Sequence, residues 1–221
     1  MGYIEILDII EKHFTQTYYF IYSFERYKYK CKWMLYFDID EHLEFVDKKI
    51  TINDYLSQER FKKCEVIKIN WVMYTNTNEN LLYYDNRTLK ERFPNPTYVK
   101  EDVRTVKSIV RNNARRNPWL YNSAPHEPAK WLRSCNSIGN YSPYNGGIIY
   151  PPIISYCYLK HYHYKTIEEF VNKMKRGRYN GEKFNIDYKV KIYFERNKYS
   201  KEKVELIEKL FNKTFKWLHK K

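Results

Sequence analysis

Glycine and proline are scarce in this chain, which has 6 glycines and 8 prolines among 221 residues. Because aromatic residues make up 19% of the same chain, a low-complexity, disordered protein is excluded. The chain also lacks the roughly 18 consecutive apolar residues that a membrane-spanning helix needs. The nearest stretch, residues 146–159, is interrupted by Pro151 and Pro152. The composition therefore predicts a soluble domain with a sizeable core, and the mean hydropathy of −0.79 agrees.

Cysteine is rare as well, and its spacing is irregular. The four cysteines are Cys31, Cys64, Cys135 and Cys157. Their separations match neither a zinc site nor a compact disulfide framework, so we expect reduced thiols in the cytoplasm. The first residues carry Glu5, Asp8 and Glu11 without an early basic cluster, which is not the pattern of a secretory signal.

Acidic residues are too few to balance the basic ones. The chain has 40 lysines and arginines against 26 aspartates and glutamates, a net charge of +14. Such a surface attracts nucleic acid, anionic lipid or phosphorylated small molecules. The charge alone does not distinguish among these partners.

Apolar patterns along the chain predict alternating helices and strands, and hence a mixed α/β fold. Strands are expected at 33–37, 64–74, 103–110 and 153–164, and helices at 4–14, 52–60, 166–176 and 200–218. Asn53 or Thr51 caps the second helix, while Thr166 and Glu169 form a capping box. Residues 17–29 are ambiguous, and 112–147 read as a long irregular region.

The triplet Asp38-Ile39-Asp40 follows the apolar run 33–37, which we interpret as a strand buried on both faces. Side chains two residues apart in a strand point the same way, so the two carboxylates would lie side by side. Such a pair is favourable when a divalent cation lies beside it. A triplet of this kind also arises by chance, and its position after the strand is what favours a site.

Two further segments could carry chemistry. His161 and His163 would share a face at a strand end, where imidazoles could bind a metal, or one could be exposed and the other in the core. His126 and Glu127 lie between two prolines, where either could be a general base or simply part of a rigid turn. Gly146-Gly147 is not a phosphate loop, because no Lys-Ser/Thr follows it.

Three arginines complete the candidates. Arg111, Arg115 and Arg116 could bind phosphate, or they could be solvated residues of a basic loop. The sequence alone leaves both interpretations open.

Five segments occur in an order that resembles the family 92 glycosyltransferases and the related family 2-like bacterial and viral enzymes. The segments are Lys32–Leu43, Ile69-Asn70-Trp71, Val106–Val110, Ala124-Pro125-His126, and His161-Tyr162 followed by Lys165–Phe170. The resemblance covers about residues 16–180. It implies a GT-A-like, Rossmann-like mixed sheet flanked by helices, and sugar transfer from a nucleotide-diphosphate sugar with Mn²⁺ or Mg²⁺.

The resemblance also implies roles for individual residues. Asp38 would contact the nucleotide ribose or the metal, and Asp40 would be the principal metal ligand. His161 would lie near the diphosphate as a further ligand, and Lys107 would belong to the donor-binding segment. His126 and Glu127, with Glu41 as a further choice, are the candidates for the acceptor side or the general base.

The chain departs from the family pattern in three places. Only 37 residues precede Asp38, so we expect an N-terminally truncated GT-A domain over 1–197 and a basic amphipathic helix over 198–221. A misassigned start, a partner supplying the missing part, or a decayed remnant would each explain the short N-terminal part. His42 replaces a usual Phe, and residues 75–78 replace a Gly-rich turn in the segment that the resemblance implies to be the acceptor loop.

The resulting expectation is a cytoplasmic enzyme of surface polysaccharide or glycan biosynthesis, peripheral at the inner face of an anionic membrane. Its partners would be a nucleotide sugar and a glycan, lipid-linked or protein acceptor, and no nucleic acid is expected. The alternatives are an inactive glycosyltransferase fragment and a basic nucleic-acid-binding module.

Overall fold

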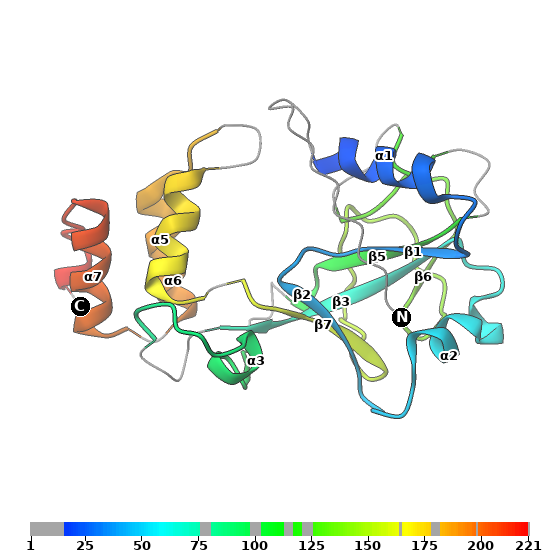
Figure 1. Ribbon diagram of the computed structural model, residues 1–221, viewed down its shortest axis with the longest axis horizontal. Helices are drawn as coiled ribbons and strands as arrows, with labels where there is room; N and C mark the ends of the chain where they lie inside the picture. The colour runs from blue at the N-terminus through cyan, green and yellow to red at the C-terminus, as the bar shows by residue number, and fades with distance from the viewer. Residues whose placement is uncertain are drawn as a thin grey trace.

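The computed structural model describes residues 16–75, 81–97, 103–112, 117–120, 126–163, 165–177, 182–197 and 199–220. Its fold is mixed α/β, with a curled sheet flanked by helices (Figure 1). The helices are α1 (Gln16–Tyr27), α2 (Ile52–Ser57), α3 (Leu89–Arg92), α5 (Ile167–Arg176), α6 (Ile186–Arg196) and α7 (Lys201–Phe211), with 3₁₀ turns at Glu59–Phe61 and Leu218–Lys220. The expected helix at 4–14 lies outside the described residues. The predicted fold class is therefore confirmed at the level of a mixed α/β protein.

The sheet is built around one long strand, β3 (Val66–Tyr74). The other strands are β1 (Trp33–Tyr36), β2 (Glu41–Phe45), β4 (Pro96–Thr97), β5 (Val106–Arg111), β6 (Ser134–Asn136) and β7 (Cys157–His161). The strand order is β1-β5-β3-β7-β2, and β4 and β6 also pair with β3. Because β3 and β7 run parallel while β1–β5, β5–β3 and β2–β7 are antiparallel, the sheet is mixed.

Local signals predicted several elements well. The Thr51 and Thr166 side chains accept hydrogen bonds from the N3 backbone of α2 and α5, and each forms a complete capping box. The α5 helix stops at Gly177, whose φ is 81°. The strand predicted at 64–74 is confirmed as β3, which is buried along almost its whole length.

The strand predicted at 33–37 is present as β1, but the interpretation that it is buried on both faces is wrong. β1 is the edge strand of the sheet, and the Leu35 side chain is 41% exposed. Its apolar residues are instead covered from outside the sheet: Tyr36 packs with Phe20 of α1 and with Trp119, at ring distances of 4.9 and 4.7 Å. A helix lying over an edge strand produces the same apolar run as burial between two strands.

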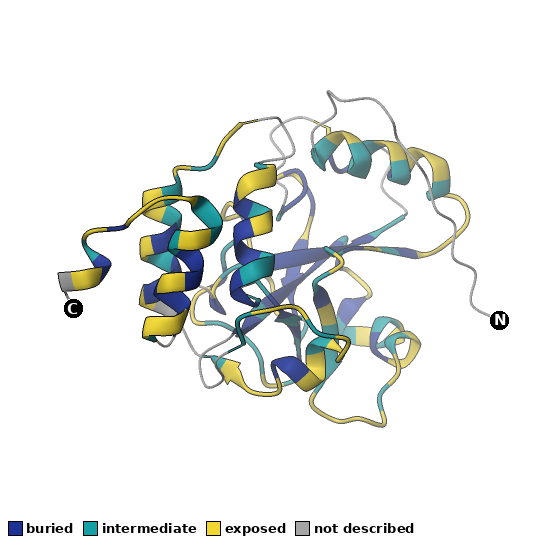
Figure 2. Ribbon diagram, turned by 60° about the vertical axis from the view of Figure 1, so that its left-hand side comes forward, coloured by how far each residue is buried: buried dark blue, intermediate teal, exposed yellow. Residues whose placement is uncertain are grey.

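The C-terminal helix is shorter than its apolar pattern suggests. α7 ends at Phe211, because Asn212 adopts a left-handed conformation with φ 51°. Phe215 and Leu218 still reach the apolar cluster that α5, α6 and α7 form with Met73 of the sheet. Figure 1 shows these three helices together at one end of the sheet, and Figure 2 shows their buried faces turned toward one another.

The expectation of reduced thiols throughout is also wrong. Cys64 and Cys135 form a disulfide across 71 residues of sequence. They meet because β6 runs parallel to the start of β3, with Cys135 opposite Ile67. Such a pairing depends on tertiary structure and has no spacing signature. None of the helices in the described ranges combines the length and apolar character that crossing a bilayer requires.

Candidate functional site

The segment Asp38–Asp40 forms a tight turn between β1 and β2. The Glu41 amide donates to the Asp38 carbonyl at 2.9 Å, and the Asp38 amide donates to Glu41 Oε2 at 2.9 Å. The Tyr162 amide donates to the Asp40 carbonyl at 3.0 Å, which fixes the turn against the end of β7. The prediction that both aspartates extend from the strand is wrong, since β1 ends at Tyr36, and the two side chains have different partners, Lys107 for Asp38 and Lys165 for Asp40.

Asp38 is held by a lysine of the neighbouring strand. Lys107 of β5 is buried, and its Nζ lies 2.8 Å from Asp38 Oδ2 and 3.6 Å from Glu41 Oε1. Gln16 Nε2 donates to the other Asp38 oxygen at 3.0 Å. The Asp38 side chain is nevertheless 44% exposed, so it remains accessible to the hydroxyl group of a ligand.

Asp40 lies beside His161, the last residue of β7. Asp40 Oδ1 is 3.9 Å from His161 Nε2, and Asp40 Oδ2 is 3.6 Å from Lys165 Nζ. The His161 ring is buried against the Trp71 indole, with ring centres 4.2 Å apart. Its Nδ1 has no hydrogen-bond partner among the residues that the structure describes. The turn before β2 and the strands β7 and β3 thus position a carboxylate beside an imidazole.

These two side chains fit a divalent cation. Burial lowers the pKa of His161 to about 3, with Lys173 and Lys107 adding to the effect, so the imidazole is neutral at pH 7, as a metal ligand must be. Within the described ranges, no three His, Cys, Asp or Glu side chains are grouped to hold a metal by themselves. The protein would therefore supply Asp40 and His161, and phosphate oxygens and water would complete the coordination.

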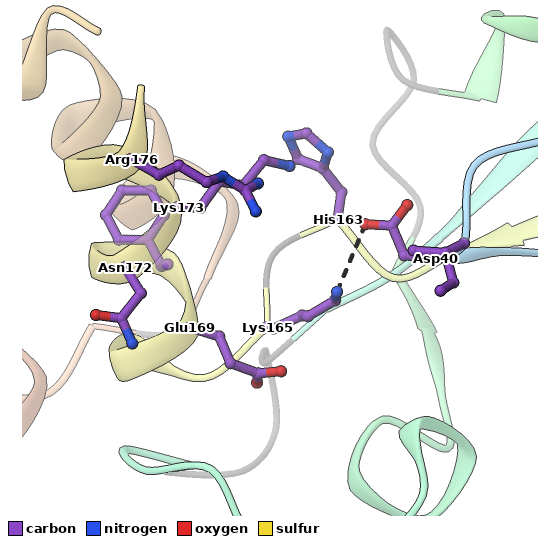
Figure 3. A pocket seen from close by; sticks show the side chains of 9 residues that line it. Asp40, His163, Lys165, Glu169, Asn172, Lys173 and Arg176 are labelled. Atoms are coloured by element: carbon purple, nitrogen blue, oxygen red, sulfur yellow. Dashed lines mark ion pairs between the residues drawn. The ribbon is translucent and has the colours of Figure 1, made fainter. Parts of the chain in front are cut away.

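A cavity of about 420 Å³ opens directly beside Asp40 (Figure 3). It lies between the turn that carries Asp40 and the α5 helix, and it is lined by Ile39, Asp40, His163, Lys165, Glu169, Phe170, Asn172, Lys173 and Arg176. Three of these residues are cationic, while Glu169 is already paired with Arg92 at 2.7 Å. Such a cavity suits an anionic ligand of small-molecule size.

The two sequence candidates for a general base lie in different environments. The His126 ring packs edge-on against Trp71, with ring centres 5.2 Å apart, so it belongs to the same aromatic cluster as His161. Glu127 instead points away into the interior, where it forms a buried ion pair with Lys68 of β3. Its Oε2 also accepts hydrogen bonds from the Asn145 and Gly147 amides at 3.0 and 2.7 Å. The structure thus brings His126 to the site but not Glu127.

The remaining candidates from the sequence are His163 and three arginines. His163 lines the cavity, with its ring centre 4.9 Å from that of His161. Arg111 donates to the carbonyls of Cys64 and Phe61, at 2.7 and 2.5 Å, and so joins loops rather than binding phosphate. Arg115 and Arg116 lie outside the described residues.

Sequence reasoning missed Lys173 and Arg176. They lie three positions apart on α5, so both side chains occupy the face that borders the cavity. The basic last turn of a capped helix was a usable signal. It did not single out the cavity, because basic residues are common in this position for electrostatic reasons.

We expect the buried histidines to make the protein sensitive to acid. Burial, assisted by Lys107, lowers the pKa of His126 to about 4, whereas burial raises the pKa of Glu41 to about 7. Between pH 4.5 and 6.5, roughly, the unfolded chain gains protons on both His126 and His161, while the folded chain gains one on Glu41. Stability from the histidines is therefore lost as the pH falls, and Glu41 offsets only part of this loss.

Thermal melts at pH 7 and pH 5 measure this effect. The His161→Gln variant cannot gain the proton, so its melting temperature should fall less than that of the wild type. His42→Gln, at an exposed histidine of β2, is the matched control. An equal fall in wild type and His161→Gln would mean that His161 does not couple to folding.

No family model matches this chain, and no curated protein is significantly similar to it.

Proposed function

We propose that this chain is a metal-dependent glycosyltransferase domain of GT-A-like architecture that takes a nucleotide-diphosphate sugar as donor. One observation carries the proposal: Asp40 lines a cavity together with Lys165, Lys173 and Arg176, and its Oδ1 lies 3.9 Å from Nε2 of the buried His161. The carboxylate suits Mn²⁺ or Mg²⁺, the neutral imidazole favours Mn²⁺ of the two, and the cationic side chains suit a diphosphate.

The residues of the cavity would divide the work between them. A bound cation would polarise the diphosphate and stabilise it as a leaving group. Lys165, Lys173 and Arg176 would neutralise its remaining charge and orient it. Asp38, held by Lys107 but still partly exposed, would accept a hydrogen bond from the nucleotide ribose.

On the acceptor side, His126 is the candidate general base. Its low pKa, about 4, leaves the imidazole unprotonated at neutral pH, as a base must be. The family 2-like motifs imply inversion at the sugar carbon, which requires one base and an in-line displacement. The acceptor class proposed is a glycan, a lipid-linked sugar or a protein, as in surface polysaccharide or glycan biosynthesis.

The location proposed from the sequence is the cytoplasm, with peripheral contact to an anionic membrane. Several exposed lysines of α7 and the segment after it supply a basic surface for such contact. The Cys64–Cys135 disulfide favours an oxidising compartment instead. Labelling of free thiols in the native cells distinguishes the two compartments, because Cys64 and Cys135 react only where they are reduced.

An inactive glycosyltransferase fragment is the second candidate function. The basis for it is that Asp38 and Asp40 are each paired with a lysine, at 2.8 and 3.6 Å, so the site is neutralised without a metal. A fragment of this kind would melt cooperatively but bind no nucleotide sugar.

Removing the cavity cations should weaken donor binding with or without a metal. For the double variant Lys173→Gln/Arg176→Gln we expect roughly a tenfold to hundredfold weaker affinity for UDP or GDP, because two charge-assisted contacts are lost. The remaining affinity should depend less on salt concentration. Calorimetric titration at two ionic strengths measures both effects.

Lys175→Gln is the control for this experiment. Lys175 is an exposed residue of the same helix and does not line the cavity. Wild-type affinity in the double variant, or an equal loss in the control, would show that the cavity does not bind the diphosphate.

A further inference from the structure

A second hollowed surface, away from the Asp40 cavity, is formed by three depressions that share residues. They have volumes of about 170, 460 and 510 Å³. Tyr141 borders all three, and Arg133 borders two. We call these three adjoining depressions together the Tyr141 groove; its principal side chains are those of Lys63, Lys130, Trp131, Arg133, Tyr141, Tyr144 and Tyr150. It shares no lining residue with the cavity beside Asp40.

One end of the Tyr141 groove is cationic. Lys63, Lys130 and Arg133 are exposed there, and none of the ion pairs among the described residues involves their side chains. Glu59 also lines this end, and it is paired with Lys62 at 3.0 Å. Arg60 lies behind them, stacked on the Tyr156 ring at 4.1 Å. Gly139 allows this position, because a Cβ at residue 139 would lie 2.9 Å from the Arg60 Cβ. This end is therefore preformed and attracts anions.

The other end carries no charge. It is lined by tyrosine, proline, isoleucine, serine and asparagine residues between Asn136 and Ile153. Its loop is fixed from beneath: Lys68 Nζ donates to the Pro143 carbonyl at 2.7 Å, and Glu127 accepts from the Asn145 and Gly147 amides. The loop therefore holds its tyrosines without a ligand.

Exposed aromatic rings run through the groove. Trp131 is 47% exposed, Tyr141 67% and Tyr150 63%. Flat aromatic faces can stack on nucleic-acid bases or on the apolar faces of sugar rings. A hollow surface with aromatic faces and one cationic end thus fits an extended ligand.

The distribution of charge selects between these two ligands. A nucleic-acid strand carries a phosphate on every residue, so its binding groove is cationic along its length. The uncharged half of the Tyr141 groove would leave several phosphates without partners. An oligosaccharide with only some acidic units matches both halves.

We propose that the Tyr141 groove binds an acidic oligosaccharide. Neutral sugar units lie over Tyr141, Tyr144 and Tyr150, and a carboxylate or sulfate group contacts Arg133 and Lys63. This binding needs no nucleotide sugar and no metal, so it stands independently of the activity proposed above.

Fluorescence titration of the full chain tests the proposal with four probes. These are two hexasaccharides in which every second unit is acidic, of hyaluronan and of unsulfated chondroitin, the neutral cellohexaose and a single-stranded hexanucleotide. We expect at least one acidic sugar to bind about tenfold more tightly than both other probes. Tighter binding of the hexanucleotide, or no binding of either acidic sugar, would overturn the proposal.

Single substitutions test whether the acidic sugar binds in the Tyr141 groove. Tyr141→Ala and Arg133→Gln should each weaken the acidic sugar about tenfold, since each removes one central contact from an exposed position. The matched controls are Tyr188→Ala and Lys209→Gln, at exposed residues of α6 and α7, which should bind as the wild type does. UDP affinity should be unchanged in all four variants. Unchanged sugar binding in Tyr141→Ala would place the ligand elsewhere and contradict the proposal.

Discussion

Asp40→Asn is expected to weaken the Mn²⁺-dependent binding of UDP or GDP by about 100-fold. The substitution keeps the size of the side chain but removes the negative charge, and a metal–carboxylate contact of this kind is worth a few kcal/mol in a partly buried site. Calorimetric titration with and without Mn²⁺ measures the effect. Metal-free binding should change little, because the cationic residues of the cavity remain.

Two further variants are compared with Asp40→Asn. Asp47→Asn alters an exposed aspartate outside the cavity and should bind as the wild type does. Asp38→Asn should weaken nucleotide binding equally with and without Mn²⁺, since Asp38 pairs with Lys107 and would contact the ribose. If Asp40→Asn retained the full Mn²⁺ effect, the metal role of Asp40 would be refuted.

The largest loss of stability is expected from Lys68→Met. Lys68 and Glu127 form an ion pair in which both side chains are almost completely buried. Removing one partner leaves an unpaired charge in the interior, which costs about 3–5 kcal/mol. Lys68 also donates to the Pro143 carbonyl, so the loop 141–153 should loosen. Urea unfolding measures the change in the free energy of unfolding.

Adding Glu127→Gln to Lys68→Met should restore part of the lost stability. In the double variant Lys68→Met/Glu127→Gln no charge is buried, and the amide oxygen can still accept from the Asn145 and Gly147 amides. It should therefore be more stable than Lys68→Met alone. Lys201→Met, which breaks an exposed pair with Glu205, should cost at most about 0.5 kcal/mol. A loss below about 1 kcal/mol in Lys68→Met would show that the buried pair does not support the fold.

The elements that sequence reasoning predicted are those with local causes. The capping boxes at Thr51 and Thr166 involve residues three positions apart, and β3 has a long apolar run of its own. The α6 helix escaped notice because its hydrophobic pattern is weak beside its many charged residues. Its apolar side chains pack against those of α5 and α7, and only this tertiary contact shows which face of the helix is buried.

The candidate site was predicted in part, for a similar reason. Asp40 and His161 are 121 positions apart, and the motif order alone suggested that they meet, which the β2–β7 pairing of Glu41 with His161 explains. Neither the lysine partners of Asp38 and Asp40 nor the burial of Glu127 has a sequence pattern. Each depends on which strand lies beside which, and that follows from the sheet topology.

The central claim is that one cation contacts both His161 and the diphosphate of the donor. Pulsed electron paramagnetic resonance of Mn²⁺ with the protein and UDP tests it directly, because ¹⁴N and ³¹P nuclei bound to the same ion give separate couplings. We predict a ³¹P coupling from the nucleotide together with a ¹⁴N coupling that disappears in His161→Gln. A ³¹P coupling without any ¹⁴N coupling in the wild type would mean that the nucleotide carries the metal alone, and it would contradict the account.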